Sequence, residues 1–123
     1  MSAADAEFWS ALDRLVANSR LVLDRPRGSR HPRFPERIYP LDYGYLDGTA
    51  AADGGGIDAW LGALGDRRLT AVLLTVDLLK RDTELKLLLG CTPPEQRTAL
   101  EFQKSGTQRA ILVDRPHPTS EES

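Results

Sequence analysis

The segment from Asp24 to Pro40 limits most strongly what this chain can fold into. It contains four prolines, at positions 26, 32, 35 and 40. Proline lacks a backbone N–H donor and fixes its own φ angle, so it is excluded from helix interiors and from central strands. Each proline also biases the residue before it toward extended conformations. We therefore expect an irregular coil over the surface, and a coil of this length is typical of a functional segment.

Two helices and several short strands are predicted on either side of the coil. Apolar residues with i, i+4, i+7 and i+8 spacing predict an amphipathic helix over residues 3–19. Thr92, Pro93 and Glu95 form a capping-box pattern, so a second helix is expected from there to about residue 104. Short runs at 21–23, 43–46, 57–61, 69–76, 84–89 and 109–113 predict five or six strands. The expected fold class is mainly β with flanking helices (α+β), arranged as a small closed β-barrel.

The length and composition indicate one domain. The chain has 123 residues, of which 41% are hydrophobic and 28% charged, which is enough for a buried core. We expect residues 1–115 to form a single domain, built from the 3–19 helix and a 20–113 core. Residues 116–123 are expected to form a flexible polar tail.

Cysteine usage and hydropathy indicate a soluble cytoplasmic protein. The lone Cys91 excludes an internal disulfide framework and a Cys-based zinc site, and it fits a reducing compartment. No apolar run reaches the roughly 18 residues of a membrane span, and the acidic N-terminus lacks the features of a secretory signal. We therefore expect the cytoplasm as the location and no membrane partner.

Opposite charges are segregated along the chain, although the formal net charge is only -2. Five arginines and His31 crowd into residues 25–37, whereas residues 42–84 carry a series of carboxylates. Arginine binds phosphate in a bidentate manner, and carboxylate oxygens suit hard cations such as Mg²⁺. The pair of segments therefore suits a small polyphosphate that arrives with its metal ions. A solvated basic loop is the plain alternative.

Three local patterns are candidate parts of a site. Asp53 and Asp58 flank a run of three glycines. They either bind a cation or are solvent-exposed residues of a simple turn. All three tyrosines of the chain lie at 39–45, where they either contact phosphate or fill a half-buried strand face. Asp77 follows one predicted strand, and Glu84 and Lys86 share a face of the next. That pair forms either a surface ion pair or a metal ligand beside a phosphate clamp.

In this order the motifs resemble the signature region of the family I soluble, Mg²⁺-dependent inorganic pyrophosphatases. The family pattern is Tyr-Pro-x-x-Tyr-Gly-Tyr, then a Thr, then Asp-Gly-Asp-x-x-Asp before an apolar strand. The matching positions are Tyr39, Pro40, Tyr43, Gly44, Tyr45, Thr49, Asp53, Gly54 and Asp58. The resemblance covers roughly residues 20–113 and leaves the 3–19 helix unexplained.

The resemblance implies a five-stranded OB-like barrel that hydrolyses pyrophosphate to two phosphates with Mg²⁺. It implies that the metal ligands are Asp53, Asp58, Asp77 and Glu84, of which the three aspartates are also catalytic. The phosphate-contacting positions it implies are Tyr43, Lys86 and Lys104, with Arg30 and Arg33 as replacements for charges of a missing family hairpin. The expected partner is therefore a small-molecule phosphoanhydride.

The departures from the family pattern keep a second function open. Gly55 stands where the family has its water-activating aspartate, and Gln103 stands where it has a tyrosine. Loss of a general base typically lowers a rate by about 10²–10⁴, so weakened hydrolysis is the first reading. The alternative is a non-catalytic relative that binds phosphate or nucleotide. Nucleic acid is disfavoured, because the carboxylates beside the tyrosines repel a polyanion. The first helix either covers a barrel edge or forms a homo-oligomer contact.

Overall fold

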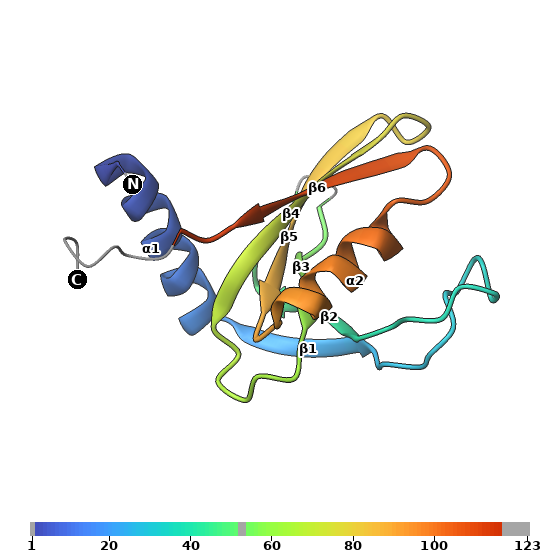
Figure 1. The fold of residues 1–123 in the computed structure, drawn as a ribbon, viewed down its shortest axis with the longest axis horizontal. Helices are drawn as coiled ribbons and strands as arrows, with labels where there is room; N and C mark the ends of the chain where they lie inside the picture. The colour runs from blue at the N-terminus through green and yellow to red at the C-terminus, as the bar shows by residue number, and fades with distance from the viewer. Residues whose placement is uncertain (1, 52–53, 117–123) are drawn as a thin grey trace.

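The computed structural model describes residues 2–51 and 54–116 (Figure 1). The elements in chain order are α1 (Ala3–Ala17), β1 (Arg20–Arg25), β2 (Asp42–Asp47), β3 (Ile57–Leu61), β4 (Leu69–Asp77), β5 (Asp82–Leu89), α2 (Pro93–Gln103) and β6 (Gln108–Asp114). The fold is therefore mainly β with flanking helices, as predicted. The predicted ligand Asp53 and most of the predicted tail lie outside the described residues.

The strands form one open sheet in the order β1-β2-β3-β5-β4-β6. Neighbours are antiparallel except for β3 and β5, which are parallel. Within the described ranges the sheet has six strands and no pairing joins β1 to β6, so the prediction of a closed, five-stranded barrel is wrong. The coil that follows the edge strand β1 contains the four prolines, which lack backbone N–H donors, and within the described ranges it adds no strand to the sheet.

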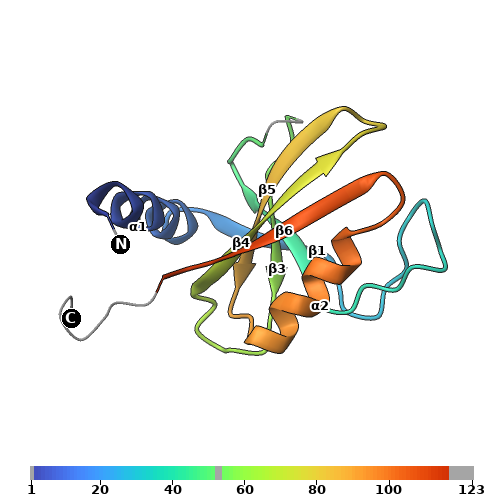
Figure 2. The same ribbon diagram turned by 45° about the horizontal axis from the view of Figure 1, so that its top comes forward.

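Each face of the sheet has a buried part, which packs on one helix. Period-2 alternation places Ala59 and Leu61 on one face and Asp58 and Trp60 on the other. The first face packs on Trp9 of α1 through Leu46, Ala59, Leu61, Val72, Leu87 and Leu89. The second face packs on Ala99 of α2 through Trp60, Ala71, Leu73, Leu88 and Cys91. Figure 2 shows α2 lying across the sheet, whereas α1 stands at one end. We call the second face the α2 face.

Helix boundaries follow from local capping. In α2 the Thr92 side chain accepts from the Glu95 N–H, and the Glu95 carboxylate accepts from the Thr92 N–H, which confirms the predicted capping box. The same carboxylate accepts from the N–H of Ala63, so it also fixes the loop after β3. Neither helix of the described segments is long and apolar enough to cross a membrane.

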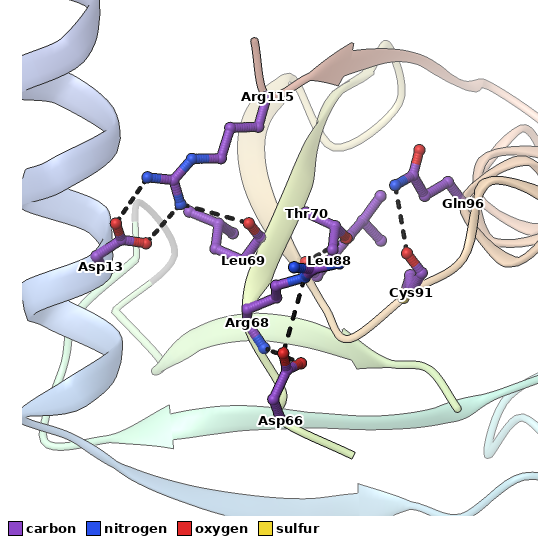
Figure 3. Close-up of polar contacts among 9 residues, drawn as sticks. All are labelled: Asp13, Asp66, Arg68, Leu69, Thr70, Leu88, Cys91, Gln96 and Arg115. Atoms are coloured by element: carbon purple, nitrogen blue, oxygen red, sulfur yellow. Dashed lines mark hydrogen bonds and ion pairs between the residues drawn. The ribbon is translucent and has the colours of Figure 1, made fainter. Parts of the chain in front are cut away.

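Charge pairing holds α1 against the end of β6. The Arg115 guanidinium donates to both carboxylate oxygens of Asp13, each at 2.7 Å, and also contacts the carbonyl of Leu69 (Figure 3). A bidentate arginine–carboxylate pair fixes orientation as well as proximity. The pair therefore sets the position of α1 at this end of the sheet.

The proline-containing coil is irregular, as predicted, and it folds back on itself. Backbone hydrogen bonds join Gly28 to Tyr39, Tyr39 to Ser29, His31 to Arg37 and Arg37 to Phe34. One isolated bridge pairs Arg30 with Ile38. In both ribbon views the coil lies on the same side of the molecule as the β4–β5 turn and the α2–β6 loop (Figures 1 and 2).

Candidate active site

A buried lysine forms the centre of the site. Lys86 lies on β5 and is only 6% exposed. Its Nζ lies 2.8 Å from Tyr43 Oη, 3.0 Å from Asp58 Oδ2 and 3.0 Å from Glu84 Oε2. An ammonium has three donors and no acceptor, so these three oxygens satisfy it completely. The predicted common face of Glu84 and Lys86 is thereby confirmed.

Strand register brings these four side chains together. The parallel pairing of β3 with β5 sets Ala59 opposite Leu87, so the residues just before them, Asp58 and Lys86, are neighbours. Alternation along β5 then places Glu84 on the same α2 face as Lys86. The cluster is therefore set by the backbone pairing of the sheet.

Electrostatics keep the lysine charged and the tyrosine neutral. Burial alone favours a neutral amine, but the neighbouring Tyr43 and Asp58 oxygens outweigh burial and raise the pKa of Lys86 above its ordinary value. Burial raises the pKa of Tyr43 above its ordinary value, with Lys86 offsetting only part of the effect. At neutral pH the site therefore contains a charged Lys86 ammonium and a neutral Tyr43 phenol.

The cluster opens into a pocket of about 550 Å³ between the coil, the β4–β5 turn and the α2–β6 loop. Three further cations line it: Arg33 and Arg37 from the coil and Lys80 from the turn. Arg37 is fixed there, because its guanidinium lies 4.0 Å from the centre of the Phe102 ring and donates to the Phe102 carbonyl. The pocket therefore presents cations around the mouth of the Lys86 cluster.

Three of the five predicted phosphate-binding residues line the pocket, and the other two do not. Tyr43, Lys86 and Arg33 line the pocket. Arg30 instead donates to the carbonyl of Pro35 and holds the coil. Lys104 forms an exposed ion pair with Glu101.

Two cationic side chains that line the pocket, Arg37 and Lys80, were not among the predicted site residues. The sequence did not identify Arg37 because it is held by the distant Phe102. It did not identify Lys80 because the geometry of the β4–β5 turn positions that residue. The available signals were an arginine two residues before the tyrosine motif and a lysine three residues after Asp77.

Asp77 lies in the pocket wall and organises the β4–β5 turn. Its Oδ1 accepts from the N–H groups of Leu79 and Lys80, at 2.9 and 3.1 Å, and from the Thr107 hydroxyl at 2.8 Å. These bonds, led by the one from Lys80, lower the pKa of Asp77 below its ordinary value. The carboxylate thus positions Lys80 and joins the turn to the start of β6.

The described part of the glycine loop is held by the threonine of the sequence motif. Thr49 Oγ1 accepts from the Ile57 N–H at 2.9 Å and donates to the Leu46 carbonyl at 2.7 Å. Both ends of the loop are therefore anchored to β2 and β3. Within the described ranges no group of three or more histidine, cysteine, aspartate or glutamate side chains is placed to hold a metal ion. Asp58 and Glu84 are the two predicted ligands that meet at one point, on Lys86.

Solved structures share this fold. An inorganic pyrophosphatase from Neisseria gonorrhoeae aligns with a TM-score of 0.55 at 20% identity, covering 77% of this chain and 81% of that one. The inorganic pyrophosphatase from Helicobacter pylori aligns with a TM-score of 0.52 at 16% identity, covering 76% and 81%. An inorganic phosphatase from Anaplasma phagocytophilum gives 0.53 at 15% identity, covering 76% and 81%. No protein-family model and no curated protein matches the sequence. The chain therefore has the fold of the inorganic pyrophosphatases, as its sequence motifs predict.

Proposed function

We propose that this protein hydrolyses a phosphoanhydride, with inorganic pyrophosphate as the simplest substrate and two phosphates as products. The observation that carries the proposal is the charged Lys86, buried between Asp58 and Glu84 at the base of a pocket with a cationic mouth. The fold shared with inorganic pyrophosphatases supports it. A small-molecule partner follows from the size and charge of the pocket.

The donor chemistry of the site fits Mg²⁺. Asp58 and Glu84 each lie 3.0 Å from the same nitrogen, so their carboxylates are close together. Carboxylate oxygens are the ligands that this hard cation takes. We propose that these two residues, with Asp53 and Asp77, hold the metal. When bound, Mg²⁺ lowers the pKa of water and neutralises phosphoryl charge.

The chain's own residues bind and orient the substrate. All three donors of Lys86 are already taken, so a phosphate oxygen must replace Tyr43, Asp58 or Glu84 as one of its acceptors. If Asp58 and Glu84 held Mg²⁺, Lys86 would exchange one of these acceptors for phosphate more easily. Arg33, Arg37 and Lys80 are placed to stabilise the outer oxygens through charge-assisted hydrogen bonds. Gly55 offers no side chain as a base, so turnover is slow.

Phosphate release from pyrophosphate, measured with and without Mg²⁺, tests the proposal. Asp58→Asn keeps the size of the side chain and removes its charge, and it should lower the Mg²⁺-dependent rate at least tenfold. Asp47→Asn is the matched control, because Asp47 lies on β2 in an exposed pair with Arg20. Equal rates in wild type and Asp58→Asn, or no release at all, contradict the proposal. Binding without release indicates the non-catalytic alternative instead.

The cytoplasmic location and the oligomeric state of the protein stay predictions. The free, buried Cys91 is compatible with a reducing cytoplasm. A homo-oligomer contact formed by α1 stays a prediction.

A further inference from the structure

The outer wall of the pocket carries an exposed aromatic ring. Phe34 is 50% exposed, at the tip of the coil, and it lines the pocket together with His31. The two ring centres lie 5.2 Å apart, with their planes tilted by 40°. The His31 ring stacks in turn on Tyr39, at 6.1 Å and 5°. Phe34 and His31 thus form an aromatic rim of the pocket. Pyrophosphate has no apolar surface, so binding of this anion alone does not account for the rim.

Hydrogen bonds within the coil hold the aromatic rim in place without a ligand. His31 Nδ1 accepts from the backbone N–H groups of Arg33 and Phe34, at 3.1 and 3.2 Å. The imidazole is therefore neutral with its proton on Nε2, and burial together with the neighbouring Arg37 lowers the pKa of His31 in agreement. Pro32 and Pro35 restrict the backbone on both sides. A preformed surface binds a planar ligand with little loss of conformational entropy.

An unbroken row of rings connects the rim to the Lys86 cluster. Lys86 Nζ lies 5.4 Å from the centre of the Tyr43 ring, and Tyr43 lies 5.6 Å from Tyr39. Tyr39 contacts His31, which contacts Phe34. One end of the pocket is thus ionic and the other aromatic. Its volume of about 550 Å³ lies in the range of pockets for drug-sized ligands.

We propose that the substrate is a nucleoside polyphosphate, with its base stacked on Phe34 and His31 and its terminal phosphates beside Lys86 and Lys80. The inference rests on the proposed function for the position of the phosphates. In the reaction the oxygen of water bonds to the terminal phosphorus while the bridging P–O bond breaks. The electron pair leaves with the shortened nucleotide, and the proton of water goes to solvent.

Affinity for adenosine triphosphate against inorganic tripolyphosphate, titrated by calorimetry with Mg²⁺ at constant ionic strength, tests the inference. Tripolyphosphate has the same anhydride chain without the nucleoside, and it carries more charge, so electrostatics alone favour it. Stacking of a base should make the nucleotide bind roughly 5- to 150-fold more tightly. Phe34→Ala should abolish this preference and leave tripolyphosphate affinity unchanged. Phe34→Leu keeps an apolar side chain without a π face and should also reduce it.

The matched control for Phe34→Ala is Phe8→Ala. Phe8→Ala removes an equally exposed ring on α1, outside the pocket lining, and should leave the preference intact. Equal affinity for the two ligands overturns the inference, as does the failure of both to bind or an equal loss of both in Phe34→Ala. Base-dependent binding without phosphate release supports the stacking of the base on Phe34 and contradicts the proposed hydrolysis, so the two failures are distinguishable.

Discussion

Lys86 and Asp58 form an ion pair of 3.0 Å across the parallel pairing of β3 with β5. The lysine side chain is almost completely buried, and Glu84 Oε2 also lies 3.0 Å from the same nitrogen. A buried charge without a partner is strongly destabilising. The pair therefore links stability and function, because the group that would bind a phosphate also holds two carboxylates in place.

Replacement of Lys86 by Met should destabilise the protein by about 3 kcal/mol, because Asp58 and Glu84 lose their buried partner. Urea unfolding monitored by circular dichroism measures the change. Lys104→Met is the control, since the exposed Lys104–Glu101 pair should contribute no more than about 1 kcal/mol. An equal effect of the two substitutions contradicts a buried and satisfied lysine at position 86.

Stability should fall when the pH rises above about 10, the range in which free lysine and tyrosine lose their protons. The pKa values of both Lys86 and Tyr43 are raised in the folded state. Folded protein therefore keeps protons that unfolded protein has released, so rising pH favours unfolding. The contribution of the two groups is fully present below that range. Urea midpoints measured from pH 8 to 11 should decline less steeply in the Lys86→Met, Tyr43→Phe double variant than in wild type.

Local pattern was sufficient to predict the strands, the α2 capping box and the common face of Glu84 and Lys86, because these depend on neighbours within a few residues. The open sheet was not predictable in the same way. Whether β3 pairs with β5, and whether β1 meets β6, depends on contacts between distant segments that period-2 alternation does not specify.

The same limit applies to the site. The sequence predicts which residue types suit phosphate and metal, but it does not predict which arginine of the coil reaches the pocket. Arg37 lies in the pocket because it contacts Phe102, 65 residues further along the chain. Arg30 instead donates to the carbonyl of Pro35 within the coil.

Substitutions of Asp77 should separate its structural role from its proposed metal role. All three of its side-chain hydrogen bonds use Oδ1, which asparagine retains. Asp77→Asn should therefore lower the melting temperature less than Asp77→Ala does, and raise the Mg²⁺ concentration needed for half-maximal phosphate release. Asp77→Ala should lower the melting temperature as well, since the β4–β5 turn loses its acceptor. An unchanged Mg²⁺ requirement in Asp77→Asn limits this residue to the structural role.

Introduction of an acid at position 55 should increase the rate of pyrophosphate hydrolysis. Gly55 occupies the position at which the resemblance to family I pyrophosphatases implies a water-activating aspartate. A general base contributes about 10²–10⁴ to a rate, so Gly55→Asp should raise kcat by up to that factor. KM should change little, because Lys86 and the pocket cations are untouched. Gly65→Asp adds the same charge to the exposed turn after β3 and should leave kcat unchanged. If Gly55→Asp has no effect on kcat while the protein remains folded, the missing base is not what limits hydrolysis.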